Sequence, residues 1–73
     1  MKLIMCGRHL LVEPSEDPNR GTLRGMRDTG WLGLEIGDTL LYEARWTVPV
    51  EFNNKCWLAI EADHVIGILR HDD

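Results

Sequence analysis

Residues that break regular structure are so frequent in this chain that they limit it to short elements. Seven glycines, three prolines and the pair Asn53-Asn54 interrupt its 73 residues. They leave pieces of about four to ten residues, a spacing typical of small all-β domains. No stretch keeps the apolar period of 3.6 residues that marks an amphipathic helix. We therefore expect an all-β fold: a small antiparallel sheet or partly open barrel of about four to six short strands, with at most one short helical turn.

The clearest strand signal is an alternation of apolar and polar residues across positions 39–48. Successive side chains of a strand point to opposite faces, so the apolar members share one face. They are Leu40, Tyr42, Ala44, Trp46 and Val48. We expect this strand at the centre of the sheet, with Trp46 in the core. Replacing Trp46 by alanine should then cost about 3 to 5 kcal/mol.

Local signals place further strands and turns. Asparagine tolerates the left-handed conformation, so Asn53-Asn54 predicts a hairpin over residues 50–60, beside the central strand. Gly25, within a strand over 22–27, indicates a β-bulge or a close approach of two backbones. Further strands are expected over 8–13 and 64–70, with a helical turn over 61–63 and fraying of the last two or three residues.

Length and composition predict one domain spanning residues 1–73. The chain is too short for two typical domains. Its proportions of 44% apolar and 27% charged residues are ordinary for a globular protein. Its apolar runs are too short to span a membrane or to form the core of a signal peptide. We therefore expect a soluble cytoplasmic protein without membrane contact.

Two cysteines and two histidines leave a metal site open as an alternative. Cys6-x-x-His9 has the spacing of zinc ligands, and Cys56 with His64 completes a set of four. The second pair is too widely spaced for a zinc knuckle. The simpler interpretation, which we prefer, is two small core thiols and surface imidazoles, with no bound metal or cofactor.

The sequence lacks the pattern of an active site. Ser15, the only serine, lies in a proline-containing loop without the glycine-flanked turn of a nucleophile. No glycine-rich phosphate-binding motif precedes a lysine. A small chain also rarely encloses the ~300 Å³ pocket that a substrate needs. We therefore expect a protein without enzymatic activity.

Basic and aromatic residues indicate a surface for binding a partner. Residues 20–27 carry three arginines and no acid, although the net charge of the whole chain is −4. Such an acidic chain is a poor stand-alone binder of nucleic acid. Trp31 follows in a glycine-flanked loop, and both tryptophan and arginine are enriched at protein interfaces. The predicted contact surface comprises Arg20, Arg24, Arg27, Trp31, Glu43 and Arg45.

Two stretches of the chain resemble co-chaperonins. One is Arg20-Gly21-Thr22-Leu23, followed by Gly30 and by Ile36-Gly37-Asp38-Thr39-Leu40-Leu41-Tyr42, and the other is Ala62-Asp63-His64-Val65-Ile66-Gly67-Ile68-Leu69. Co-chaperonins dock on the chaperonin through a long mobile loop with an apolar tripeptide. At that point this chain has only residues 15–19, none of them apolar. The resemblance therefore implies β architecture and not chaperonin binding.

The length of 73 residues and the opening of the chain carry a second resemblance. The opening is Met1-Lys2-Leu3-Ile4-Met5-Cys6-Gly7-Arg8-His9-Leu10-Leu11. The whole chain looks like a small lytic-phage transcription regulator that binds host RNA polymerase. This resemblance implies contacts with the beta and beta-prime subunits near the RNA exit channel, with the elongation factor NusA as helper. It also implies displacement of the sigma factor, inhibition of promoter use and read-through of terminators.

The leading hypothesis is therefore a monomeric, non-enzymatic bacteriophage regulator of RNA polymerase, acting in the cytoplasm of the bacterial host and contacting nascent RNA only indirectly. One alternative is a co-chaperonin-like β domain that works as an oligomeric interaction module. The other is a small zinc- or nucleic-acid-binding module. Mass in solution, metal content and salt-sensitive binding to bare nucleic acid separate these hypotheses.

Overall fold

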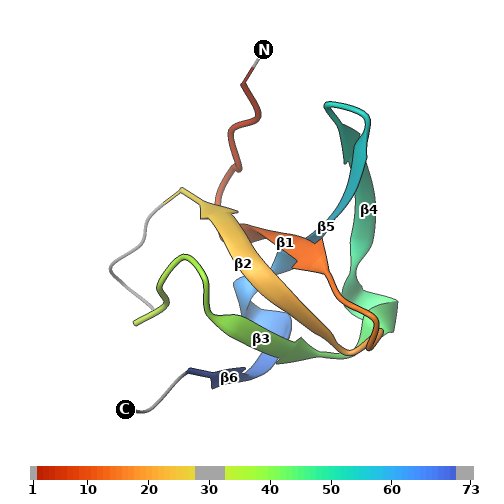
Figure 1. Ribbon diagram of the computed structural model, residues 1–73. Coiled ribbons are helices and arrows are strands. Elements are labelled where there is room, and N and C mark those ends of the chain that lie inside the picture. Colours follow the sequence, from red (N-terminus) through yellow and green to blue (C-terminus); the bar gives the residue numbers. More distant parts are fainter. Residues whose placement is uncertain (1, 28–32, 71–73) are drawn as a thin grey trace.

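The protein folds into six antiparallel strands that form one sheet, which confirms the all-β fold. The computed structural model describes residues 2–27 and 33–70 (Figure 1). The strands are β1 (His9–Pro14), β2 (Arg20–Met26), β3 (Thr39–Tyr42), β4 (Val48–Phe52), β5 (Lys55–Glu61) and β6 (Val65–Leu69). Two 3-10 turns are also described, η1 (Ala44–Trp46) and η2 (Ala62–His64), where the sequence predicted at most one. The predicted fraying falls on residues 71–73, outside the described residues.

The order of the strands makes the sheet curl on itself. The order is β4-β5-β1-β2-β3-β6, so β1 and β2 are central and β4 and β6 lie at the edges. Only η2 separates the end of β5 from the start of β6, although three other strands lie between them in the sheet. The sheet must therefore bend around to bring β6 against β3, as Figure 1 shows.

The core lies on the concave face of this curled sheet and follows the two-residue period of the strands. Its fully buried apolar residues are Leu10, Val12, Leu23, Leu34, Leu40, Tyr42 and Ile60. Leu10 and Val12 alternate in β1, and Leu40 and Tyr42 alternate in β3. The predicted burial of Leu40 and Tyr42 is therefore confirmed.

Gly25 lies at the predicted bulge. Leu11 pairs with Gly25 and Val12 pairs with Leu23, which leaves Arg24 as an extra residue in β2. A β-carbon at Gly25 would lie 3.3 Å from Leu11 Cβ, so the two backbones also approach closely. Both readings of this glycine are confirmed.

The predicted hairpin forms, but it does not lie beside the 39–48 segment. Asn53 and Asn54 have positive φ values of 53° and 60° and join β4 to β5. β5 pairs with β1, however, so the hairpin lies on the opposite side of the central strands from β3. The pairing of distant segments decides this arrangement, and the local pattern carries no information about it.

The expected strand over 39–48 ends at Tyr42 and is not central. The chain turns at η1, where the backbone N–H and the hydroxyl of Thr47 both donate to the Ala44 carbonyl, at 3.1 and 2.7 Å. This turn rotates Trp46 out of the alternation. Its side chain is 44% exposed and stacks on His64 with ring centroids 4.3 Å apart. Trp46 is therefore a surface residue, and the sequence-based prediction of its burial is wrong.

Replacing Trp46 by alanine should lower the free energy of unfolding by only about 1 to 2 kcal/mol. The change removes one ring stack and opens no enclosed cavity, because the site faces solvent. Urea denaturation followed by circular dichroism measures the effect. Leu23→Ala is the matched core variant and should cost about 2 to 5 kcal/mol. Equal losses for both variants would show that Trp46 belongs to the core.

Candidate functional site

The arginines of the predicted contact surface are not isolated from acids in space. Arg20 Nε lies 3.4 Å from an Asp17 carboxylate oxygen, and Arg24 Nε lies 2.8 Å from Glu13 Oε2. Residues 20–27 contain no acid, but Glu13 of β1 and Asp17 of the loop that follows β1 lie beside these arginines in space. Two of the three positive charges are therefore compensated within the chain.

Glu13 links three neighbouring strands through its carboxylate. One oxygen accepts a bond from Lys55 Nζ of β5 at 2.9 Å, and the other accepts from Arg24 of β2. The hydrogen bond from Lys55, followed by that from Arg24, holds the pKa of Glu13 below its usual value. Glu13 is therefore ionised at neutral pH and fixes the direction of the Arg24 side chain.

The structure divides the predicted contact surface into two parts. Arg20 is the first residue of β2 and lies near η1. The backbone N–H of Ala44 in η1 donates to Oδ1 of the neighbouring Asn19 at 3.3 Å. Glu43 and Arg45 belong to this end and pair with each other at 2.6 Å. Arg27 follows the other end of β2, about 20 Å away at the usual rise of a strand. Trp31 lies outside the described residues.

The Arg27 end of β2 borders a groove of about 330 Å³ that we call the arm groove. Its other side is residues 2–6, the N-terminal arm, which belong to no strand and lead away from β1 in Figure 1. The apolar residues that line the groove are Leu3, Ile4, Met5, Leu11 and Met26, and the cations are Lys2, Arg24 and Arg27. The arm is not part of the contact surface predicted from the sequence. The available signal was its apolar run next to a lysine, in a segment without acids.

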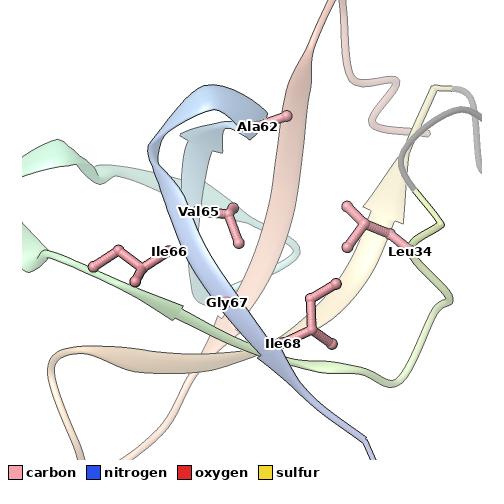
Figure 2. A pocket seen from close by; sticks show the side chains of 6 residues that line it. All are labelled: Leu34, Ala62, Val65, Ile66, Gly67 and Ile68. Atoms are coloured by element: carbon pink, nitrogen blue, oxygen red, sulfur yellow. The ribbon is translucent and has the colours of Figure 1, made fainter.

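A second pocket, of about 240 Å³, lies against the edge strand β6. Figure 2 shows Val65 and Ile68 of β6 on the same side as Leu34, with Ile66 on the other side. Ala62 and Gly67 also line it, and none of the described side chains around the pocket is ionisable. The pocket offers apolar contact and no acid–base chemistry.

Asp38 is the most perturbed carboxylate near this edge. It is 5% exposed, and its two oxygens accept bonds from Arg70 Nε at 2.9 Å and Arg70 Nη2 at 2.6 Å. The backbone N–H of Glu35 adds a third bond at 2.8 Å. The bonds from Arg70 are the main cause of the lowered pKa of Asp38. Because both oxygens are occupied, Asp38 holds the 35–38 turn to the end of β6 and is not free for catalysis.

The residues of the alternative zinc site are not brought together. Cys6 and Cys56 are exposed free thiols, which differs from the predicted core positions. His64 stacks on Trp46, and His9 Nδ1 lies 3.0 Å from the carbonyl of Cys6. Within residues 2–27 and 33–70, no three potential metal ligands converge.

Comparison with known proteins gives no relative for this chain. No protein family matches it, and no curated protein is significantly similar to it in sequence. In the described part of the chain, no helix has the length and apolar character needed to cross a membrane.

Proposed function

We propose that this chain is a non-enzymatic regulator that binds bacterial RNA polymerase, displaces the sigma factor from it and promotes read-through of terminators. The resemblance of the whole chain to a small phage transcription regulator supports the proposed partner. The arm groove is the structural observation that carries the proposal. It combines exposed apolar side chains with arginine at the surface of a small body, which is the composition of protein-docking sites.

The proposed mechanism is steric and conformational. The body measures 35 × 26 × 23 Å, large enough to occupy the path of an RNA hairpin or of a sigma-factor segment. We place it on the beta and beta-prime subunits near the RNA exit channel, with NusA as helper. Binding there favours one polymerase conformation over another, and the regulator needs no chemistry of its own.

The first experiment uses the full chain and purified bacterial core RNA polymerase. We expect the two to elute together in size-exclusion chromatography, and we expect added chain to reduce sigma-factor binding. Run-off transcription from a promoter should fall, and read-through of an intrinsic terminator should rise. Polymerases from several bacterial groups are compared because the sequence does not specify the host. If none of them retains the chain, the proposal is wrong.

The structure favours Arg27→Glu over a variant at Arg24 as the test of the contact surface. Arg24→Glu would place a second carboxylate against Glu13 and remove a cross-strand ion pair. Arg27 has no ion-pair partner among the described residues, so reversing its charge leaves the fold intact. We expect polymerase affinity to fall about tenfold, a typical cost for reversing an interface charge.

Arg45→Glu makes the same charge change at the opposite end of β2 and tests the other part of the predicted contact surface. It also breaks the exposed ion pair with Glu43. Its polymerase affinity and read-through should stay near those of the unmodified chain, with thermal unfolding used to check all variants. If Arg45→Glu lowers polymerase affinity and Arg27→Glu does not, the contact surface lies at the η1 end of β2.

A further inference from the structure

The apolar residues that line the arm groove come from the N-terminal arm and from two strands. The arm contributes Leu3, Ile4 and Met5, while Met26 comes from β2 and Leu11 from β1. Among the described residues, none that lines the groove is acidic. The groove therefore differs from the β6 pocket, which is apolar throughout and has no charge to select a partner.

The three cations of the groove are not equally available. Arg24 is engaged by Glu13, as described above. Lys2 and Arg27 are exposed, and neither has an ion-pair partner within the segments 2–27 and 33–70. Two positive charges without an ion pair to a described residue thus border the arm groove, in a chain whose net charge is −4.

The apolar side chains of the arm are also left uncovered. Ile4 is 68% exposed and Leu3 is 37% exposed. The methionines at positions 5 and 26 have unbranched, flexible side chains, which fit apolar partners of different shape. Covering these side chains would release bound water, so an apolar occupant of the groove is favoured.

We propose that the arm groove binds a short segment of a protein partner that is both acidic and apolar. Carboxylates of the segment pair with Lys2 and Arg27. An aliphatic or aromatic side chain that lies between these carboxylates enters the arm groove. This inference rests on the proposed function, in which RNA polymerase supplies the segment. The positive charges of the groove favour a segment with acidic residues, and the exposed apolar side chains of the arm favour a segment that also carries an apolar residue.

A nucleic acid fits the same surface less well. Affinity for a phosphate backbone grows with the number of cations that neutralise it, and the described part of the groove offers two without an ion-pair partner. The described side chains of its walls are aliphatic, and none of them is an aromatic ring on which a base could stack. The groove is therefore assigned to a peptide and not to RNA.

Fluorescence anisotropy with three labelled probes at low salt tests this assignment. The probes are a short peptide of alternating aspartate and leucine, the same peptide with lysine in place of aspartate, and a single-stranded oligouridylate. We expect the full chain to bind the acidic peptide at least about tenfold more tightly than the other two. Lys2→Glu with Arg27→Glu should reverse the preference between the peptides. Ile4→Ser should weaken the binding of both peptides, whereas Ile66→Ser, at an exposed position outside the groove, should change neither.

Equal binding of the two peptides, tighter binding of the oligouridylate, or no binding of the acidic peptide would overturn the inference. A parallel binding assay with RNA polymerase distinguishes failure of the groove assignment from failure of the proposed function. If the double variant keeps full affinity for polymerase, the groove assignment is wrong and the polymerase proposal survives. If the acidic peptide binds as expected but no polymerase is retained, the groove assignment stands and the partner is another protein.

Discussion

Gly21→Ala should remove most of the stability of the fold. Gly21 is a buried residue of β2, and a β-carbon there would lie 2.5 Å from Tyr42 Oη and 3.0 Å from the Glu13 carbonyl oxygen. It would also overlap Val12 Cγ1. Val12 and Tyr42 are fully buried, so neither side chain has space to move away. We expect a loss of at least about 3 kcal/mol, against a total stability of about 5 kcal/mol for so small a domain.

Gly67→Ala is the matched control for this variant. Gly67 also lies within a strand, but a β-carbon there would meet only Leu41 Cδ1, at the ordinary distance of 3.7 Å. The urea midpoint of Gly67→Ala should stay close to that of the unmodified chain, whereas the midpoint of Gly21→Ala should fall to less than about half of it. A folded Gly21→Ala protein with normal stability would mean that β1, β2 and β3 do not pack as described.

Asp38→Asn should lower the free energy of unfolding by about 2 kcal/mol at neutral pH. An amide keeps one acceptor oxygen, but its NH₂ group faces the donors of Arg70. The loss is smaller than the ~3 to 5 kcal/mol of fully buried pairs because the Arg70 side chain is 46% exposed to solvent. Urea denaturation at pH 7 measures it, and Glu51→Gln, at an exposed position without a described ion pair, should change little.

The Asp38 carboxylate also makes the stability difference between the original chain and Asp38→Asn depend on pH. The pKa of Asp38 is lower in the folded protein than its ordinary value of about 3.9. A lowered folded pKa stabilises the fold above the unfolded pKa, and the stabilisation is lost as pH falls through the folded one. The midpoints of the original chain and of Asp38→Asn should therefore converge as the pH falls below about 4. A constant gap down to pH 3 would contradict the assignment of the ion pair.

Features set by neighbouring residues were predictable from the sequence. The alternation in residues 39–42, the bulge at Gly25 and the turn at Asn53-Asn54 depend on local backbone preferences, and all three are present. The error begins after Tyr42, where the alternation continues in the sequence but the strand ends and η1 follows. The bonds that Thr47 and Asn19 make to Ala44 hold the chain in that turn.

The candidate site was less predictable because its parts come from distant positions. The arginines were found from their composition, but their partners Asp17 and Glu13 were visible only once β1 and β2 were paired. The arm joins Arg27 in one groove although more than twenty residues separate Lys2 from it in the sequence. Nothing near Asp38 in the sequence indicates that it pairs with Arg70.

The curl of the sheet has a consequence for the order of events after synthesis. β1 is made early, yet one of its edges is completed only by β5, with His9 opposite Glu61. β3 in turn pairs with β6, the last of the described strands in sequence. Pairing between such distant segments slows folding, because loop closure precedes any gain from contacts. The chain should therefore stay protease-sensitive until β6 is available for pairing, and it should then fold in milliseconds to seconds.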